Sequence, residues 1–130
     1  MSNTDWQVTT IGLLTVIESL SGEQLVVKKI TDNGIQFTNG MSLSHDHVQD
    51  CCENVYAGWK SGFADGITLE PTHQLSILIV PEAGIRVNGV FVPCYNEQNG
   101  YYSSGLALVW SSPNTDTRID ISEGVEDRIF

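Results

Sequence analysis

Apolar and polar residues alternate over much of this 130-residue chain, a pattern typical of strands that bury one face. Four Asn-Gly pairs interrupt the alternation, at residues 33–34, 39–40, 88–89 and 99–100. Both residue types tolerate the positive φ that two-residue hairpin turns require, so each pair is a strong signal for a turn. The pattern therefore predicts a succession of antiparallel hairpins, with positive φ at the glycines and often at the asparagines.

The first two Asn-Gly pairs predict a three-strand antiparallel meander from about residue 25 to about residue 45. Leu25 to Thr31 is the first expected strand. In the second and third strands, apolar residues alternate with polar ones, and the expected core-facing positions are Ile35, Phe37, Met41 and Leu43.

A second group of strands is expected in the C-terminal half. Residues 75–80 (Leu-Ser-Ile-Leu-Ile-Val) are nearly all apolar, which is typical of a central strand covered on both faces. Pro81 should end this strand, because proline removes a hydrogen-bond donor. The other expected strands are 85–87, 90–92, 101–110 and 117–122, the last with Ile119 and Ile121 on one face.

Helix signals are short and compete with strand signals. The segment 8–20 has apolar residues at helical spacing (Leu13, Val16, Ile17 and Leu20), but it is rich in Thr, Val and Ile. Helix and strand both stay open there. Asp50 is expected to cap a short helix that begins at Cys51, with Glu53 in its first turn, followed by irregular chain over residues 59–66.

These patterns together predict a β-rich α+β fold. The length suits one hydrophobic core, so we expect a single domain over residues 1–130. It should consist of antiparallel hairpins and meanders with one or two short helices.

Charge and cysteine content narrow the class of partner and the setting. The chain has 16 acidic and 6 basic residues, a net charge of −10, and no lysine or arginine cluster for a phosphate backbone, so nucleic acid is not an expected partner. It has neither a secretory signal nor an apolar run near the roughly 20 residues of a membrane helix, so no membrane association is expected. Three cysteines, two of them adjacent, do not suit a disulfide scaffold, which favours a reducing cytoplasm.

Residues 45–53, His-Asp-His-Val-Gln-Asp-Cys-Cys-Glu, concentrate the candidate chemistry. If the third strand of the meander continues, His45 and His47 face the core, and Cys51 follows one helical turn later on the same face. Imidazole and thiolate suit zinc, which makes His45, His47 and Cys51 candidate metal ligands. Their spacing is not a standard zinc arrangement, so we expect no cofactor, with zinc as the alternative.

A thiol nucleophile is a second interpretation of the same segment. Cys51 or Cys52 at a helix N-terminus beside His47 would have its thiolate favoured, and Asp50 would orient the imidazole. These four are the candidate catalytic residues, although Asp50 and Glu53 oppose added negative charge. The competing interpretation is structural, with hydrogen-bonded imidazoles and thiols packed in the core.

A second polar cluster covers residues 94–103, Cys-Tyr-Asn-Glu-Gln-Asn-Gly-Tyr-Tyr-Ser. Aromatic rings beside a glycine turn offer contact area, so Asn99, Tyr101 and Tyr102 are candidate binding residues. The alternative is that these tyrosines pack on the sheet as cross-strand pairs. His73, which stands alone before a strand, is expected to face solvent.

Residues 47–56, His-Val-Gln-Asp-Cys-Cys-Glu-Asn-Val-Tyr, and residues 99–103, Asn-Gly-Tyr-Tyr-Ser, resemble the paired motifs of a family of small uncharacterised phage and bacterial proteins. The family pattern is His-x-Gln-Asp-Cys-Cys-Glu-x-Val, followed further along by Asn-Gly-Tyr-Tyr-Ser. This family is a domain of unknown function, so the resemblance implies a phage-like origin, in a bacterial or phage-infected cell, and no reaction. Residues 59–82 depart from the pattern.

The favoured interpretation is a non-enzymatic protein that acts by contact with a protein partner. Small size, acidity and the lack of a recognisable catalytic set support it. The alternative is a metal- or thiol-dependent enzyme centred on His47, Asp50, Cys51 and Cys52, in which the two motifs meet in space. An open cleft lined by these side chains would favour the enzyme, whereas burial without a cavity would favour contact.

Overall fold

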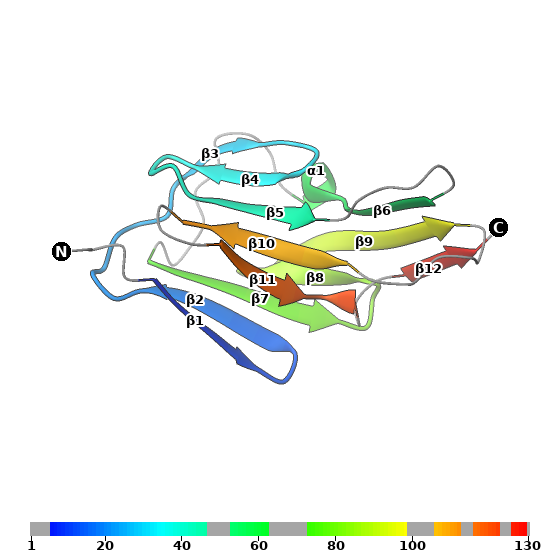
Figure 1. Ribbon diagram of the computed structural model, residues 1–130, viewed down its shortest axis with the longest axis horizontal. Helices are drawn as coiled ribbons and strands as arrows, with labels where there is room; N and C mark the ends of the chain where they lie inside the picture. Colours follow the sequence, from blue (N-terminus) through cyan, green and yellow to red (C-terminus); the bar gives the residue numbers. More distant parts are fainter. Residues whose placement is uncertain are drawn as a thin grey trace.

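The computed structural model describes residues 6–46, 53–62, 73–98, 106–112, 116–122 and 126–129. These residues form mainly β-strands, arranged as two sheets, with one four-residue helix, α1 (Trp59–Gly62). The expected β-rich, largely antiparallel architecture is confirmed (Figure 1).

The larger sheet has seven strands: β1 (Trp6–Ile11), β2 (Leu14–Ser19), β6 (Glu53–Ala57), β7 (Gln74–Val80), β8 (Gly84–Val87), β9 (Val90–Gln98) and β12 (Glu126–Ile129). Their order is β1-β2-β7-β8-β9-β12, and β6 also pairs with β9. All of these pairings are antiparallel except the one between β12 and β9, which is parallel.

The smaller sheet has five strands: β3 (Val27–Ile30), β4 (Gly34–Phe37), β5 (Ser42–Asp46), β10 (Ala107–Ser111) and β11 (Asp116–Asp120). Their order is β11-β10-β5-β4-β3. The expected meander over residues 25–45 is therefore confirmed as β3, β4 and β5. The last expected strand is present as β11, and Ile119 and Ile121 are both buried as expected.

Buried residues of the two sheets belong to one hydrophobic cluster, which includes Ile17 and Ile85 from the larger sheet and Leu43 and Leu108 from the smaller. In Figure 1, β10 and β11 lie in front of β7, β8 and β9. The protein is thus a two-layer sandwich whose sheets share a core.

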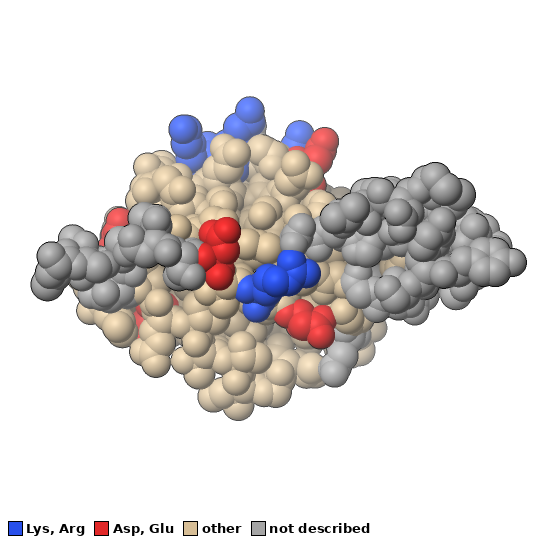
Figure 2. Space-filling model, in the orientation of Figure 1, with Lys and Arg blue, Asp and Glu red and all other residues tan. Residues whose placement is uncertain are grey.

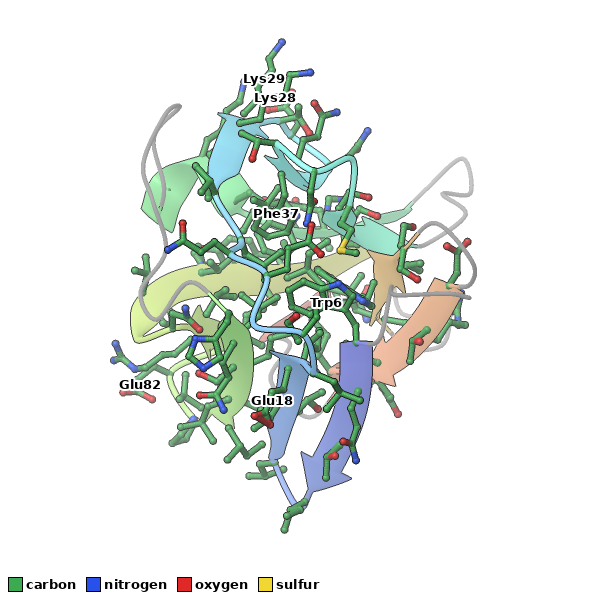
Figure 3. All side chains as sticks on the ribbon, turned by 90° about the vertical axis from the view of Figure 1, so that its left-hand side faces the viewer. Trp6, Glu18, Lys28, Lys29, Phe37 and Glu82 are labelled. Atoms are coloured by element: carbon green, nitrogen blue, oxygen red, sulfur yellow. The ribbon has the colours of Figure 1, made fainter. Side chains whose placement is uncertain are left out.

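Aromatic rings join the two layers at one end of this core. The ring centroid of Trp110 lies 5.6 Å from that of Trp6 and 5.8 Å from that of Phe37. In Figure 3, Trp6 and Phe37 point between the sheets, whereas Lys28 and Lys29 point away from β3. The start of β1 is therefore anchored to the smaller sheet by aromatic packing.

The segment 8–20, left open between helix and strand, is a β-hairpin. Gly12, with φ of 60°, turns the chain between β1 and β2. Alternate residues of β2, Thr15, Ile17 and Ser19, are buried. The helical stripe is wrong, since Leu13 and Leu20 are exposed, because pairing with β1 and β7 imposes a period of two on this segment.

Three other local expectations are corrected. Glu53 begins strand β6 rather than standing in the first turn of a helix, because residues 53–57 pair with β9 along their whole length. Trp59 to Gly62 forms α1 where irregular chain was expected. β7 is central, between β2 and β8, and ends before Pro81, but Leu78 is exposed, so the strand is not covered on both faces.

The Asn-Gly turns differ in conformation. Asn88 and Gly89 both have positive φ, 49° and 85°, as expected for the hairpin between β8 and β9. Gly40 has φ of 90°, whereas Gly34 has a nearly extended φ of 159° and is buried. The pair at residues 99–100 lies outside the described residues.

Among the described residues, no helix has the length and apolar character needed to span a membrane.

Candidate functional site

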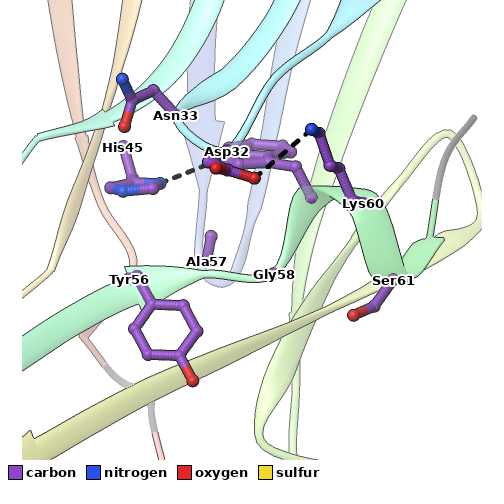
Figure 4. Close-up of a pocket in the computed structure, with 9 residues that line it drawn as sticks. Asp32, Asn33, His45, Tyr56, Ala57, Gly58, Lys60 and Ser61 are labelled. Atoms are coloured by element: carbon purple, nitrogen blue, oxygen red, sulfur yellow. Dashed lines mark hydrogen bonds and ion pairs between the residues drawn. The ribbon is translucent and has the colours of Figure 1, made fainter. Parts of the chain in front are cut away.

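A pocket with a volume of about 480 Å³ opens where three segments meet. The turn between β3 and β4 contributes Asp32 and Asn33, the end of β5 contributes His45, and the junction of β6 with α1 contributes residues 56–61. Figure 4 shows the side chains around it. The pocket is bordered by His45, a member of the His/Cys-rich segment 45–53.

His45 is half-buried, on the same side of β5 as the buried Leu43, so the expected strand phase is confirmed. Its backbone N–H donates to the carbonyl of Asn33 at 2.9 Å. On the side chain, the indole N–H of Trp59 donates to Nδ1 of His45 at 3.0 Å. Trp59 is buried, so this bond satisfies a donor that is out of reach of water.

The Trp59 bond fixes the form of the His45 ring. A nitrogen that accepts a hydrogen bond carries a lone pair, so in neutral imidazole the proton is on Nε2. A metal bound at Nε2 would need that lone pair and would move the proton to Nδ1, facing the Trp59 donor. A metal at Nε2 of His45 would therefore compete with the Trp59 hydrogen bond. The other candidate ligands, His47 and Cys51, lie outside the described residues.

The rim of the pocket is polar and electrically balanced. Lys60 Nζ lies 3.5 Å from Asp32 Oδ1, and both side chains are largely exposed. An exposed pair of this kind contributes little to stability because water screens it. Elsewhere in the described part of the chain, no group of three His, Cys, Asp or Glu side chains is placed to hold a metal ion.

The bond between Trp59 and His45 leads to a stability prediction. Trp59→Phe should cost about 1 to 2 kcal/mol more than Trp110→Phe, measured by urea unfolding. Both tryptophans are almost fully buried, so the loss of apolar volume is similar. Trp59→Phe removes the indole donor to Nδ1 of His45. Trp110→Phe removes no hydrogen bond, because the Trp110 indole N–H has no partner in the described structure.

A double-mutant cycle supplies the control. In a His45→Phe background the acceptor is already gone, so the extra cost of Trp59→Phe should largely disappear. Equal costs for the two single tryptophan substitutions would show that the Trp59 bond adds no stability.

Most of the residues singled out from the sequence lie outside the described part of the chain: His47, Asp50, Cys51, Cys52, Asn99, Tyr101 and Tyr102. The described flanks of the two motifs are nevertheless neighbours. β6 contains the end of the first motif, β9 leads into the second, and Glu53 pairs with Gln98. The rings of Tyr56 and Tyr95 pack against each other across the same strand pair, with centroids 5.3 Å apart and ring planes tilted by 50°.

Cys94 lies on β9 opposite Ala57 and is fully buried. Burial raises the pKa of its thiol to about 12, and a backbone hydrogen bond with Ile85 offsets this only in part. A thiol that stays protonated at neutral pH is a poor nucleophile and a poor metal ligand. Cys94 is therefore a packing residue. His73 is exposed, as expected from its position before β7.

A second surface was not expected from the sequence. It consists of three exposed aliphatic side chains, Ile11, Leu14 and Leu78, which we call the apolar row. Ile11 lies directly opposite Leu14, and Leu14 directly opposite Leu78, so the three side chains share the outer face of β1, β2 and β7. They are 73%, 37% and 40% exposed, and Leu13 in the adjoining turn is also exposed. The sequence does contain a signal for this surface, because Ile11 and Leu14 flank Gly12–Leu13. Ile11 and Leu14 face outward together only if the segment is a hairpin.

Comparisons of the chain with protein-family models, with curated proteins and with solved structures found no match.

Proposed function

We propose that this chain is a non-enzymatic protein of phage-like origin that acts by contact with protein, as one domain, in the cytoplasm. The observation that carries the proposal is the apolar row, which presents three large aliphatic side chains to solvent across neighbouring strands. Scattered apolar residues are normal on a surface, but a contiguous set of them is a feature of interaction sites.

The surroundings of the apolar row suit a protein contact. On the same outer face, the next cross-strand set is Thr9, Val16 and Ser76, none of which is charged. On the face turned toward the viewer in Figure 2, few charged side chains lie in the lower part of the molecule, where Figure 1 places β1 and β2. Glu18, the one charged residue of β1 and β2, lies one set further along this face, opposite Gln7 and Gln74. An apolar centre with a more polar rim is the usual anatomy of an interface.

The alternative function, a metal- or thiol-dependent enzyme centred on His47, Asp50, Cys51 and Cys52, is favoured by a different observation. The pocket lined by His45 is open, and the flanks of the two motifs pair through β6 and β9. About one zinc per chain in untreated protein, lost in His47→Ala, would support this alternative and would make His47 one of the ligands.

The contact function is tested with Ile11→Lys/Leu14→Lys. A partner is first captured by cross-linking, then purified, and its affinity is measured by calorimetry. Two aliphatic side chains buried at an interface contribute enough for their loss to weaken binding at least about tenfold. Both positions are exposed, so the variant should fold normally.

Gln24→Lys/Gln36→Lys is the matched control, because it makes the same change of charge at exposed positions away from the apolar row. We expect the control to bind like the parent protein. Equal binding by all three proteins, or equal loss in both variants, would remove the apolar row as the contact surface.

A further inference from the structure

Strand β1 is an open edge of the larger sheet. It pairs with β2 along all six of its residues, and no other described strand pairs with it. Alternate residues of an edge strand present their N–H and C=O groups outward, where another strand can add to the sheet. β1 is therefore a template for strand addition.

The other described edge strands carry the charges that usually block such addition. β3 contains Lys28 and Lys29, β6 contains Glu53, and β11 and β12 contain three charged residues each. β1 has the sequence Trp-Gln-Val-Thr-Thr-Ile, with neither charge nor proline. Among the edges that the structure describes, only β1 lacks a charged residue.

The apolar row reaches this same edge. Ile11 is the last residue of β1 and the most exposed member of the row. A strand added beside β1 would therefore cover Ile11 from the side while it completes the backbone hydrogen bonds. The open backbone edge and the exposed aliphatic surface form one continuous site.

We propose that this edge is a dimer interface, in which the β1 strands of two copies pair antiparallel about a two-fold axis and join their sheets. The dimer gives the proposed contact function, on which it rests, a specific partner: a second copy of this chain. A two-fold antiparallel pairing uses the same edge on both copies, so it is closed, and the described edges that remain outside all contain charged residues.

Charge favours a second copy over a basic partner at this site. The chain has a net charge of −10, but Glu18 is the only charged residue in β1 and β2. Figure 3 shows Glu18 on β2, not on the edge strand. A basic segment would find little to pair with at β1, whereas two neutral β1 strands meet without opposing charges. The remaining acidic surface still repels at long range, so added salt should strengthen the dimer.

The test is sedimentation of the full chain over a range of protein and NaCl concentrations. The parent protein should form a dimer that tightens with salt. Thr9 is exposed and lies mid-strand, so self-pairing brings the two copies of this residue close together. Thr9→Lys should therefore raise the dimer dissociation constant at least about tenfold, through facing like charges.

A charge-complementation experiment separates pairing from a general loss of structure. Thr9→Lys and Thr9→Glu should each be monomeric when alone and should form a mixed dimer together. Gln36→Lys, on an exposed face of β4, should dimerise like the parent protein. Thermal unfolding of each variant confirms that it is folded.

A monomer at every concentration and salt level, or a dimer that ignores both Thr9 substitutions, would overturn the β1 interface. If the chain is monomeric but Ile11→Lys/Leu14→Lys still abolishes binding of another protein, the dimer fails and the proposed contact function stands. If the Thr9 substitutions do not alter dimerisation and Ile11→Lys/Leu14→Lys does not alter binding of another protein, the dimer and the proposed contact function both fail.

Discussion

Replacing Gly34 with alanine is expected to lower the free energy of unfolding by about 3 kcal/mol or more, measured by urea unfolding. A Cβ at this position would run into the carbonyl oxygen of Leu43 and would lie 2.6 Å from Cα of Ser44. Gly34 pairs with Ser44 across β4 and β5, so the backbones cannot separate without breaking the ladder. The obstacle is backbone rather than a flexible side chain, so no rotamer change relieves it.

Gly89→Ala is the matched control for this prediction. Gly89 stands in an Asn-Gly turn too, but a Cβ there meets no atom within 4 Å, and only its φ of +85° opposes alanine. That conformational penalty should cost about 1 kcal/mol. If both substitutions cost the same, the close approach of β4 to β5 is not what requires glycine at position 34.

This contrast also shows how far local sequence determines the fold. The Asn-Gly pairs at 33–34, 39–40 and 88–89 all mark turns between strands that were predicted, because turn chemistry and period-two alternation depend on neighbours in sequence. The requirement for glycine at position 34 does not come from its neighbours in sequence. It depends on how closely β5 approaches β4, which the turn signal does not contain.

Features that depend on distant pairing were missed or assigned wrongly. The segment 8–20 carried both helical and strand signals, and its pairing with β7, some 60 residues further along, decided between them. The apolar row was missed for the same reason, since Leu14 and Leu78 become neighbours only through that register. β6 likewise became a strand because β9 offered a partner for its backbone.

The candidate site was predicted only in part. Strand phase correctly placed His45 on the core-facing side of β5, because alternation extends from Leu43. Its partner Trp59 comes from 14 residues further on and was expected to lie in irregular chain. A hydrogen bond between side chains on different elements follows from how β5 and α1 are brought together, and no spacing in the sequence encodes it.

Raising the pH from 9 to 12 is expected to destabilise the native fold through Cys94 by about 4 kcal/mol. Burial raises the pKa of this thiol from 9.0 to about 12 in the folded protein. In the unfolded chain the thiol ionises near pH 9, while in the native state it stays protonated. Stability from this group is therefore fully present below pH 9 and falls by about 1.4 kcal/mol for each pH unit up to 12.

Comparison with Cys94→Ala isolates this contribution from other groups that titrate at alkaline pH. Urea unfolding of both proteins between pH 7 and about 10.5 should give a difference in stability that is constant up to pH 9 and then shrinks in favour of the variant, by about 2 kcal/mol at the upper limit. The loss of the buried sulfur shifts the variant by a pH-independent amount, so only the slope matters. A difference that stays constant across the whole range would mean that the Cys94 thiol ionises as readily in the folded protein as in the unfolded chain, and that it is accessible to chemistry after all.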